Sequence, residues 1–288
     1  MKSFSIVGAG RLGTVLGAAL ARRGWQVEAV FDKDAAAARE SRIIIGQGRA
    51  TTDIRGPAKA GAVVFLTVPD DEVGRAAARL ARAPGAWTGR TVFHTSGLLP
   101  ARVLDPLRKR GASAASLHPV QSFPDKIAPA RIFKGVSWGV EGDAAAVRTA
   151  EGIVKDLRGH ILLLSEKDKR LYHAACSLAS NALAGLEWTA AGLLAASGMG
   201  EKEAAEVLLP LVQGTLRNVK KFGWAGALTG PVSRGDVATV REHLRALEAS
   251  PEAREAYLAL GRQTLRMAAG RGLPQARVRA MRRLFGRG

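Results

Sequence analysis

The chain has 288 residues, 47% of them hydrophobic and 24% charged, a balance typical of a globular protein and not of a disordered or fibrous one. The formal net charge of +18 favours anionic ligands, but no aromatic residues interleave with the densest basic run near the C-terminus, so we expect no nucleic-acid partner. Charges and glycines interrupt every apolar stretch before about 18 residues, so we expect no membrane segment. The first ten residues lack the order of a signal peptide, and the single cysteine, Cys176, excludes an internal disulfide. We therefore expect a cytoplasmic protein.

Short apolar runs of β type alternate with helical patterns in the first half of the chain, which predicts a parallel sheet flanked by helices. The predicted strands are residues 3–7, 26–31, 62–68, 91–95, 114–117, 136–140 and 161–164. Helices are predicted at 11–23 and 143–157, and others begin near Asp70 and Pro100.

The pattern changes after Ser165, because the remaining residues contain almost no β-rich runs. Helices are predicted near 166–196, 201–222, 236–248, 252–269 and 274–285. Ser165, with Asp168 three residues later, has the form of a capping box and marks the boundary. We therefore predict an α/β domain with a doubly wound sheet over residues 1–165 and an all-helical C-terminal domain over 166–288.

A glycine motif follows the first strand and opens the first helix, in the run Gly8-Ala9-Gly10-Arg11-Leu12-Gly13. The first glycine permits a tight turn, the second lets the backbone approach a pyrophosphate, and the third lets the helix lie close to the sheet. The free N–H groups at the helix start would then face the phosphates. This context predicts a Rossmann-type domain that holds a nicotinamide dinucleotide across the turn.

The choice between NAD and NADP stays open in the sequence. Asp32 ends the second strand 19 residues after Gly13, where an acidic residue binds the adenosine ribose, and it favours NAD because a carboxylate repels a 2′-phosphate. Lys33, Arg39 and Arg42 could neutralise that phosphate and so favour NADP.

Three further strand ends carry residues that are expected to border the ligand crevice. Val68 and Pro69 are expected to pack beside the cofactor. Ser96 lies in a loop that faces the nicotinamide, and we expect it to bind the substrate. His94 is expected to be a packed strand-end histidine. His118 precedes a proline, so its backbone is extended and holds the imidazole at the mouth of the sheet, which makes it a candidate for substrate binding or catalysis.

A polar stripe on the helix after residue 166 is a second candidate for the chemistry. His173, Ser177 and Asn181 are spaced by four residues, which places them on one face of a helix that we expect to be buried. They would bind a substrate carboxylate and carbonyl, or alternatively a neighbouring domain or subunit. Lys169 extends the stripe but suits a solvated helix start equally well, and Cys176 is expected to be a structural thiol.

A loop between two predicted helices, Thr229 to Asp236, is the last candidate. Thr229, the backbone N–H groups and Arg234 could together hold a carboxylate, although a purely structural connector is an equally good explanation. Five scattered histidines and one cysteine show no spacing of metal ligands, so we expect no metal.

Six stretches from residue 8 to 236 together resemble a bacterial family that joins an N-terminal Rossmann-like domain to a domain of unknown function numbered 2520: GAGRLG, TVPDDEV, HTSG, LHPVQSF, YHAACSLASN and TGPVSRGD. The family is similar to ketopantoate reductase, pyrroline-5-carboxylate reductase, prephenate dehydrogenase and the deazaflavin-dependent NADP oxidoreductases. The resemblance implies a role for His118, since the prephenate dehydrogenase histidine before proline contacts the reacting oxygen. Relatives dimerise through their helical domains, which implies a homodimer.

The resemblance also shows two departures. His173 stands where ketopantoate reductases carry a lysine, and Asp32-Lys33-Asp34 replaces the Ser-Arg-Ser that often accompanies NADP. We expect an oxidoreductase that uses NADP or NAD on a small keto acid or imine acid, with His118 or His173 as proton donor and ketopantoate as the favoured substrate. The alternatives are an imine reductase like pyrroline-5-carboxylate reductase and a dinucleotide-binding sensor without turnover.

Overall fold

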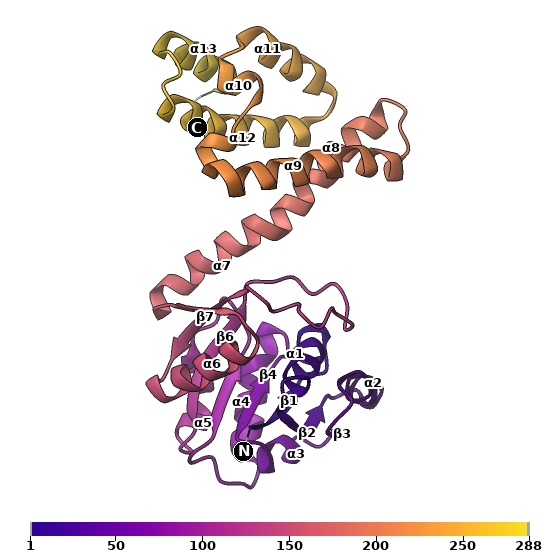
Figure 1. Cartoon of the computed structure of the whole chain (residues 1–288), viewed down its shortest axis with the longest axis vertical. Coiled ribbons are helices and arrows are strands. Elements are labelled where there is room, and N and C mark those ends of the chain that lie inside the picture. The colour runs from indigo at the N-terminus through magenta and orange to yellow at the C-terminus, as the bar shows by residue number, and fades with distance from the viewer. Residues whose placement is uncertain (1, 287–288) are drawn as a thin grey trace. The chain divides into compact units, whose positions relative to one another are not determined.

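A sheet of eight strands organises the N-terminal part of the chain in the computed structural model, which describes residues 2–286 (Figure 1). Its order is β3-β2-β1-β4-β5-β6-β7-β8, and every neighbouring pair is parallel except β6 and β7. The strands are β1 Ser3–Val7, β2 Gln26–Phe31, β3 Arg49–Thr51, β4 Val63–Leu66, β5 Thr91–His94, β6 Ser113–Pro119, β7 Ser137–Gly142 and β8 His160–Leu163. The doubly wound α/β fold is thus confirmed, with one antiparallel strand pair that the sequence pattern did not indicate.

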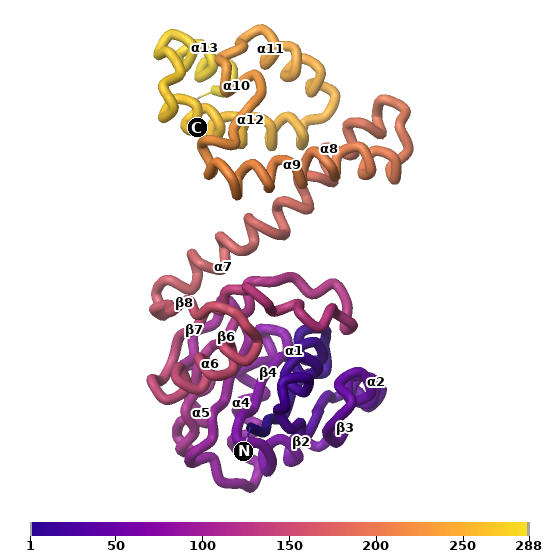
Figure 2. The backbone as a smooth tube through the Cα atoms, in the orientation of Figure 1, coloured from indigo at the N-terminus to yellow at the C-terminus, as the bar shows by residue number. Residues whose placement is uncertain are grey.

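Helices connect these strands, as the smooth backbone trace shows (Figure 2). They are α1 Arg11–Ala21, α2 Ala35–Ile45, α3 Arg55–Lys59, α4 Asp70–Arg82, α5 Asp105–Arg108, α6 Ala144–Asp156 and α7 Lys169–Ser177. Helices α2 and α3 and the short strand β3 were not predicted. Helix α4 begins at Asp70, as predicted, and its N-cap residue is Pro69, which makes no side-chain cap.

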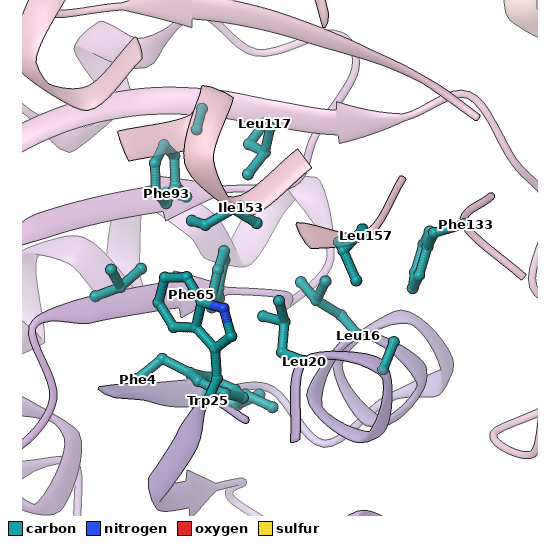
Figure 3. Packing of buried hydrophobic residues seen from close by; sticks show 14 of the residues in the cluster. Phe4, Leu16, Leu20, Trp25, Phe65, Phe93, Leu117, Phe133, Ile153 and Leu157 are labelled. Carbon is teal, nitrogen blue, oxygen red and sulfur yellow. The ribbon is translucent and has the colours of Figure 1, made fainter. Parts of the chain in front are cut away.

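Two apolar clusters lie on opposite faces of this sheet, because successive side chains of a strand alternate between its faces. In β4, Phe65 belongs to the cluster under α1 and α6, whereas Val64 and Leu66 belong to the cluster under α4. Figure 3 shows the first cluster, where Phe4, Phe65 and Phe93 from three strands lie beside Leu16 and Leu20 of α1. The core therefore holds both layers of helices onto the sheet and fixes where each strand ends.

Contacts divide the chain after Leu178 and not after Ser165, where we placed the boundary. Helix α7 belongs to the first unit, because Lys169 at its start is buried there. The predicted capping box is wrong as well: the Ser165 hydroxyl binds the carboxylate of Asp168 and makes no cap to a backbone N–H.

The second unit is all-helical, as predicted. Its elements are a π-helical turn at Leu178–Ala182, α8 Leu183–Ala196, α9 Glu201–Ala227, α10 Gly230–Arg234, α11 Val237–Ala246, α12 Pro251–Gly270 and α13 Gln275–Phe285. Its small core joins α11, α12 and α13 through Val240, Leu265, Met281 and Phe285. Gly223, at a φ of 72°, interrupts α9 where the predicted helix ended.

The expected burial of the helix at 166–196 is wrong. Lys169 is the only buried residue that α7 and α8 contribute within the described part of the chain. Leu171, Leu178 and Trp188 are 78%, 70% and 74% exposed. No residue between 2 and 286 of the same chain covers these three side chains.

Phe65 offers a test of the core. It is fully buried and its ring centroid lies 5.7 Å from that of Phe4 and 5.6 Å from that of Phe93. Phe65→Ala should destabilise the first unit by about 3–5 kcal/mol, because it removes these contacts and leaves a cavity. Chemical denaturation followed by circular dichroism measures the change. Ile127→Ala is the control, since Ile127 is 72% exposed; equal losses for both variants would contradict the packing described.

Candidate functional site

The glycine turn between β1 and α1 is held by close backbone contacts. Gly8 has a φ of 111°, and a side chain there would meet the backbone of Thr67 at 2.8 Å. A side chain on Gly13 would overlap the carbonyl oxygen of Gly8 and the hydroxyl of Thr67. The Thr67 hydroxyl donates to that same carbonyl at 2.6 Å. Packing therefore explains the glycines at both ends of the motif.

Gly10 has a different explanation. A Cβ on Gly10 would meet nothing within 4 Å, so no protein neighbour requires a glycine there. Gly10 is also the N-cap of α1, and it offers no side chain to the free N–H groups of Arg11, Leu12 and Gly13. By contrast, Asp34 caps α2 by accepting from the N–H of Ala36. The open, uncapped start of α1 can accept an anionic group.

Asp32 lies beside this turn, as expected for a residue that ends β2. Its Oδ2 accepts from the N–H of Ala9 at 2.8 Å and its Oδ1 from the N–H of Asp34 at 3.0 Å. Lys33 next to it is exposed, while the Nε of Arg42 donates to the carbonyl of Gly48. The Asp32 carboxylate is therefore fixed in place, and one of the three cations has a backbone partner.

The loop after β4 approaches the same turn. A Cβ on Gly8 would lie 2.9 Å from Cγ1 of Val68, so this side chain packs against the turn, whereas Pro69 is exposed. Their place beside the cofactor stays a prediction. The carboxylate of Asp70, in the first turn of α4, accepts from the Ser96 hydroxyl at 2.7 Å. That hydroxyl also accepts from the N–H of Leu99 at 3.0 Å. Ser96 is 7% exposed, and its side chain thus has structural partners; its role toward a substrate stays a prediction.

His118 and His173 come together at the carboxyl end of β6. Their ring centroids lie 5.9 Å apart with planes at 77°. Nδ1 of His118 forms a 2.8 Å hydrogen bond with the hydroxyl of Tyr172. Gly97 and Gly139 make room for this group, because a Cβ on Gly97 would lie 2.6 Å from His173 and one on Gly139 would lie 2.6 Å from the Tyr172 oxygen. The two histidines predicted as candidates are therefore neighbours.

The environment favours uncharged imidazoles. Burial, followed by the charges of His173 and Lys169, lowers the pKa of His118 to about 4. The fully buried His94 has a pKa lowered to about 3, mainly by burial, and its Nδ1 accepts from the N–H of Ser96. The expectation of a packed His94 fits this geometry. His118 and His94 are therefore neutral at pH 7.

Lys169 extends the stripe, as the sequence suggested, but the alternative of a solvated helix start is wrong because the side chain is buried. Its side chain is 1% exposed, and its Nζ donates to the Ser116 hydroxyl at 2.5 Å and lies 3.4 Å from the carbonyl of Ser96. The sequence did not single out Tyr172. Its place directly before His173 was visible in the sequence, but its contact with His118 depends on how α7 packs.

The predicted stripe does not follow regular α-helical spacing. Ser177 ends α7 and is half-buried, one turn beyond His173. Asn181 is exposed and lies in the π-helical turn, where hydrogen bonds span five residues and not four. The spacing argument therefore does not place Asn181 on one face with the other two residues.

Thr229 and Arg234 lie in the second unit, at the two ends of α10. Thr229 is the N-cap residue but makes no side-chain cap, and Arg234 is the last residue before Gly235. The region predicted as a loop is thus a short helix. Thr229 lines a mostly apolar pocket of about 370 Å³ with Val232, Tyr257 and other residues of the second unit.

Between residues 2 and 286, no three His, Cys, Asp or Glu side chains lie close enough together to share a metal ion. Over the same range, none of the helices combines the length and the apolar character needed to cross a membrane.

An α/β unit with a dinucleotide-type glycine turn, followed by an all-helical unit, defines a two-domain protein of the Rossmann class. A model of the Rossmann-like domain matches residues 2–119, and a model of the domain of unknown function DUF2520 matches residues 136–264. The chain belongs to the family that joins these two domains, which confirms the resemblance found in the sequence.

Solved structures share this fold along nearly the whole chain. A candidate NADP oxidoreductase, BF3122 from Bacteroides fragilis, is 22% identical, with a TM-score of 0.76 and coverage of 92% of this chain and 98% of that one. Protein TM1727 from Thermotoga maritima is 26% identical, with a TM-score of 0.72 and coverage of 93% and 99%. A reductive aminase from Aspergillus terreus, in complex with NADPH and ethyl levulinate, is 18% identical, with a TM-score of 0.63 and coverage of 95% of both chains. None of the curated proteins matches this chain.

The glycine turn provides a paired test. Gly13→Ala should destabilise the first unit by about 1–3 kcal/mol, because the new methyl group has no room. Gly10→Ala should cost less than about 1 kcal/mol, since the space beside it is open. Thermal and urea unfolding of both variants measure the difference. A Gly10→Ala protein as unstable as Gly13→Ala would show that Gly10 is needed for packing.

Proposed function

We propose that the protein is a reductase that uses NADH or NADPH to reduce the carbonyl or imine carbon of a small keto acid or imino acid. The observation that carries the proposal is that an uncapped helix start and a partly buried histidine pair both lie at the carboxyl edge of the parallel part of one sheet. In open α/β sheets this edge is where ligands bind. Similar folds in a candidate NADP oxidoreductase and in a reductive aminase bound to NADPH support the same class of reaction.

The residues of the turn fit a dinucleotide. The pyrophosphate would approach the open space at Gly10 and the N–H groups that begin α1, and Asp32 would accept from the adenosine ribose. Val68 and Pro69 follow β4 and would border the nicotinamide. When bound, the reduced cofactor supplies a hydride to the substrate carbon.

The two histidines would have different tasks. Because the pKa of His118 lies at about 4, this side chain holds no second proton at pH 7 and serves as a neutral hydrogen-bond donor. If the Tyr172 hydroxyl donates to Nδ1, the proton of His118 is on Nε2, the nitrogen that borders Gly97. The partly exposed His173 would transfer a proton to the substrate oxygen or nitrogen and recover it from solvent.

Ketopantoate is the first substrate to test, and pyrroline-5-carboxylate represents the cyclic imines. Ser177 and Asn181 would orient the substrate, with Ser96 at its border, and Thr229 with Arg234 would bind its carboxylate. These roles follow from the sequence motifs and from the chemistry of the side chains: a guanidinium binds a carboxylate through two hydrogen bonds.

Kinetics of histidine variants test the assignment. The wild type is first screened with NADH and NADPH against keto acids and cyclic imines. His173→Gln should then lower kcat about 10²–10⁴-fold, because it removes the proton donor, and His118→Gln should lower kcat/KM about tenfold or more. The control is His160→Gln, since His160 is exposed on the edge strand β8. Full turnover in both His173→Gln and His118→Gln would show that the site is wrongly assigned.

A dinucleotide-binding sensor is the second candidate, because the glycine turn alone would serve it. Calorimetric titration with NADH and NADPH separates the two functions. Tight binding with no oxidation across the substrate panel would favour the sensor.

Asp32 should control the choice of cofactor. Asp32→Ser removes the carboxylate that repels a 2′-phosphate, so the ratio of the Kd of NADPH to that of NADH should fall about tenfold, which corresponds to about 1.4 kcal/mol. Fluorescence titration of both cofactors measures it. Asp34→Ser is the matched control, since a serine retains the cap of α2. An unchanged ratio in Asp32→Ser would exclude Asp32 from the ribose site.

We further propose a homodimer formed through the helical unit. Large apolar side chains of α8 and α9 are exposed in the single chain: Trp188 is 74%, Leu211 67% and Trp224 75% exposed. The molar mass from light scattering should be near twice 30.3 kDa. Leu211→Glu should shift it toward the monomer, whereas Ile127→Glu in the first unit should not. A monomeric wild type at micromolar concentration would contradict the proposal.

A further inference from the structure

Lys169 has an environment that is rare for a lysine. Its side chain is among the largest that are fully buried, although lysines are almost never buried without an acidic partner. Within residues 2–286, no ion pair includes it, and its ammonium has only the neutral oxygens of Ser116 and Ser96 as hydrogen-bond acceptors. Burying a charge in this way costs stability, and groups of this kind occur mostly where function requires them.

The contacts of Lys169 join the parts that carry the proposed chemistry. Ser116 precedes His118 by two residues on β6, so both side chains lie on the same face of the sheet. Ser96 directly precedes Gly97, which borders both histidines. The Ser116 hydroxyl itself donates to the Ser96 carbonyl at 3.2 Å, and the ammonium contacts both groups, so it reinforces the link between the loop after β5 and the strand of His118.

The titratable groups around His118 come from several elements. Helix α7 contributes Tyr172, His173 and Lys169, β5 contributes His94, and the charges of Glu141 on β7 and Asp70 on α4 act on Lys169. Burial lowers the pKa of Lys169 to about 8, and the two carboxylates oppose this shift. The ammonium is thus mostly protonated at pH 7, where it disfavours a second positive charge on His118.

We propose that Lys169 is a positioning residue for the reduction: its ammonium binds the loop at Ser96 and strand β6 together and places a positive charge near His118, which opposes protonation of that imidazole. The inference rests on the proposed function for the role of His118. The link between the two side chains can be measured without any turnover.

The experiment is an NMR titration of the histidine side chains in the full chain. In Lys169→Met, which keeps the length of the side chain and removes its charge, the His118 midpoint should rise by roughly half a pH unit, because the nearby cation is gone while the larger effect of burial remains. Lys169→Arg should retain the low midpoint. Lys167→Met is the matched control, since Lys167 is exposed two residues earlier. In kinetics, the acidic limb of kcat/KM should move with the midpoint in Lys169→Met.

A second measurement needs no variant. Deprotonation of Lys169 near pH 8 should appear both in its own Nζ signal and as an inflection in the ring signals of the already neutral His118. An unchanged His118 midpoint in folded Lys169→Met, or the absence of that shared inflection in the wild type, would overturn the inference. If the inflection is present but no keto acid or imine is reduced, the proposed function fails while the coupling of Lys169 to His118 stands.

Discussion

The contact between the glycine turn and the end of β4 is the constraint on which the geometry of the site depends. The backbone of Gly8 lies against Thr67, whose hydroxyl donates to the Gly8 carbonyl, and α1 passes over both at Gly13. No side chain fits between these three segments, so β1, β4 and the start of α1 are held at backbone distance. The uncapped N–H groups of α1 can face the crevice at the carboxyl ends of the strands only because this packing is so close.

The histidine pair is the second feature of the site, and it consists of polar side chains where the glycine turn consists of backbone. His118, Tyr172 and His173 share a space that two glycines leave free, and Lys169 adds a buried charge behind them. Each buried polar group costs free energy unless it finds a partner. A packed apolar cluster would be more stable at this position. The presence of several polar groups at one edge of the sheet therefore supports a chemical role.

Local patterns in the sequence predicted much of the fold. Alternating apolar residues such as Val64 and Phe65 indicate a strand, and Gly8 and Gly13 indicate a turn, because these signals act within a few residues. The contacts of Lys169 with Ser116 and Ser96 join residues far apart in the chain, so no local pattern carries them. The antiparallel pairing of β7 and the exposure of α8 escaped prediction for the same reason: both depend on what packs against the element.

The hydrogen bonds of Asp32 have a thermodynamic consequence for a nucleoside ligand. A carboxylate offers about four lone-pair positions, and the backbone N–H groups of Ala9 and Asp34 use one on each oxygen. Two acceptor positions remain, as many as the vicinal hydroxyls of a ribose can fill. Because the backbone already fixes the orientation of the carboxylate, binding would freeze no rotamer of this side chain. The entropic cost of ordering this side chain arises during folding and not during binding, so a ligand would bind to a preorganised carboxylate.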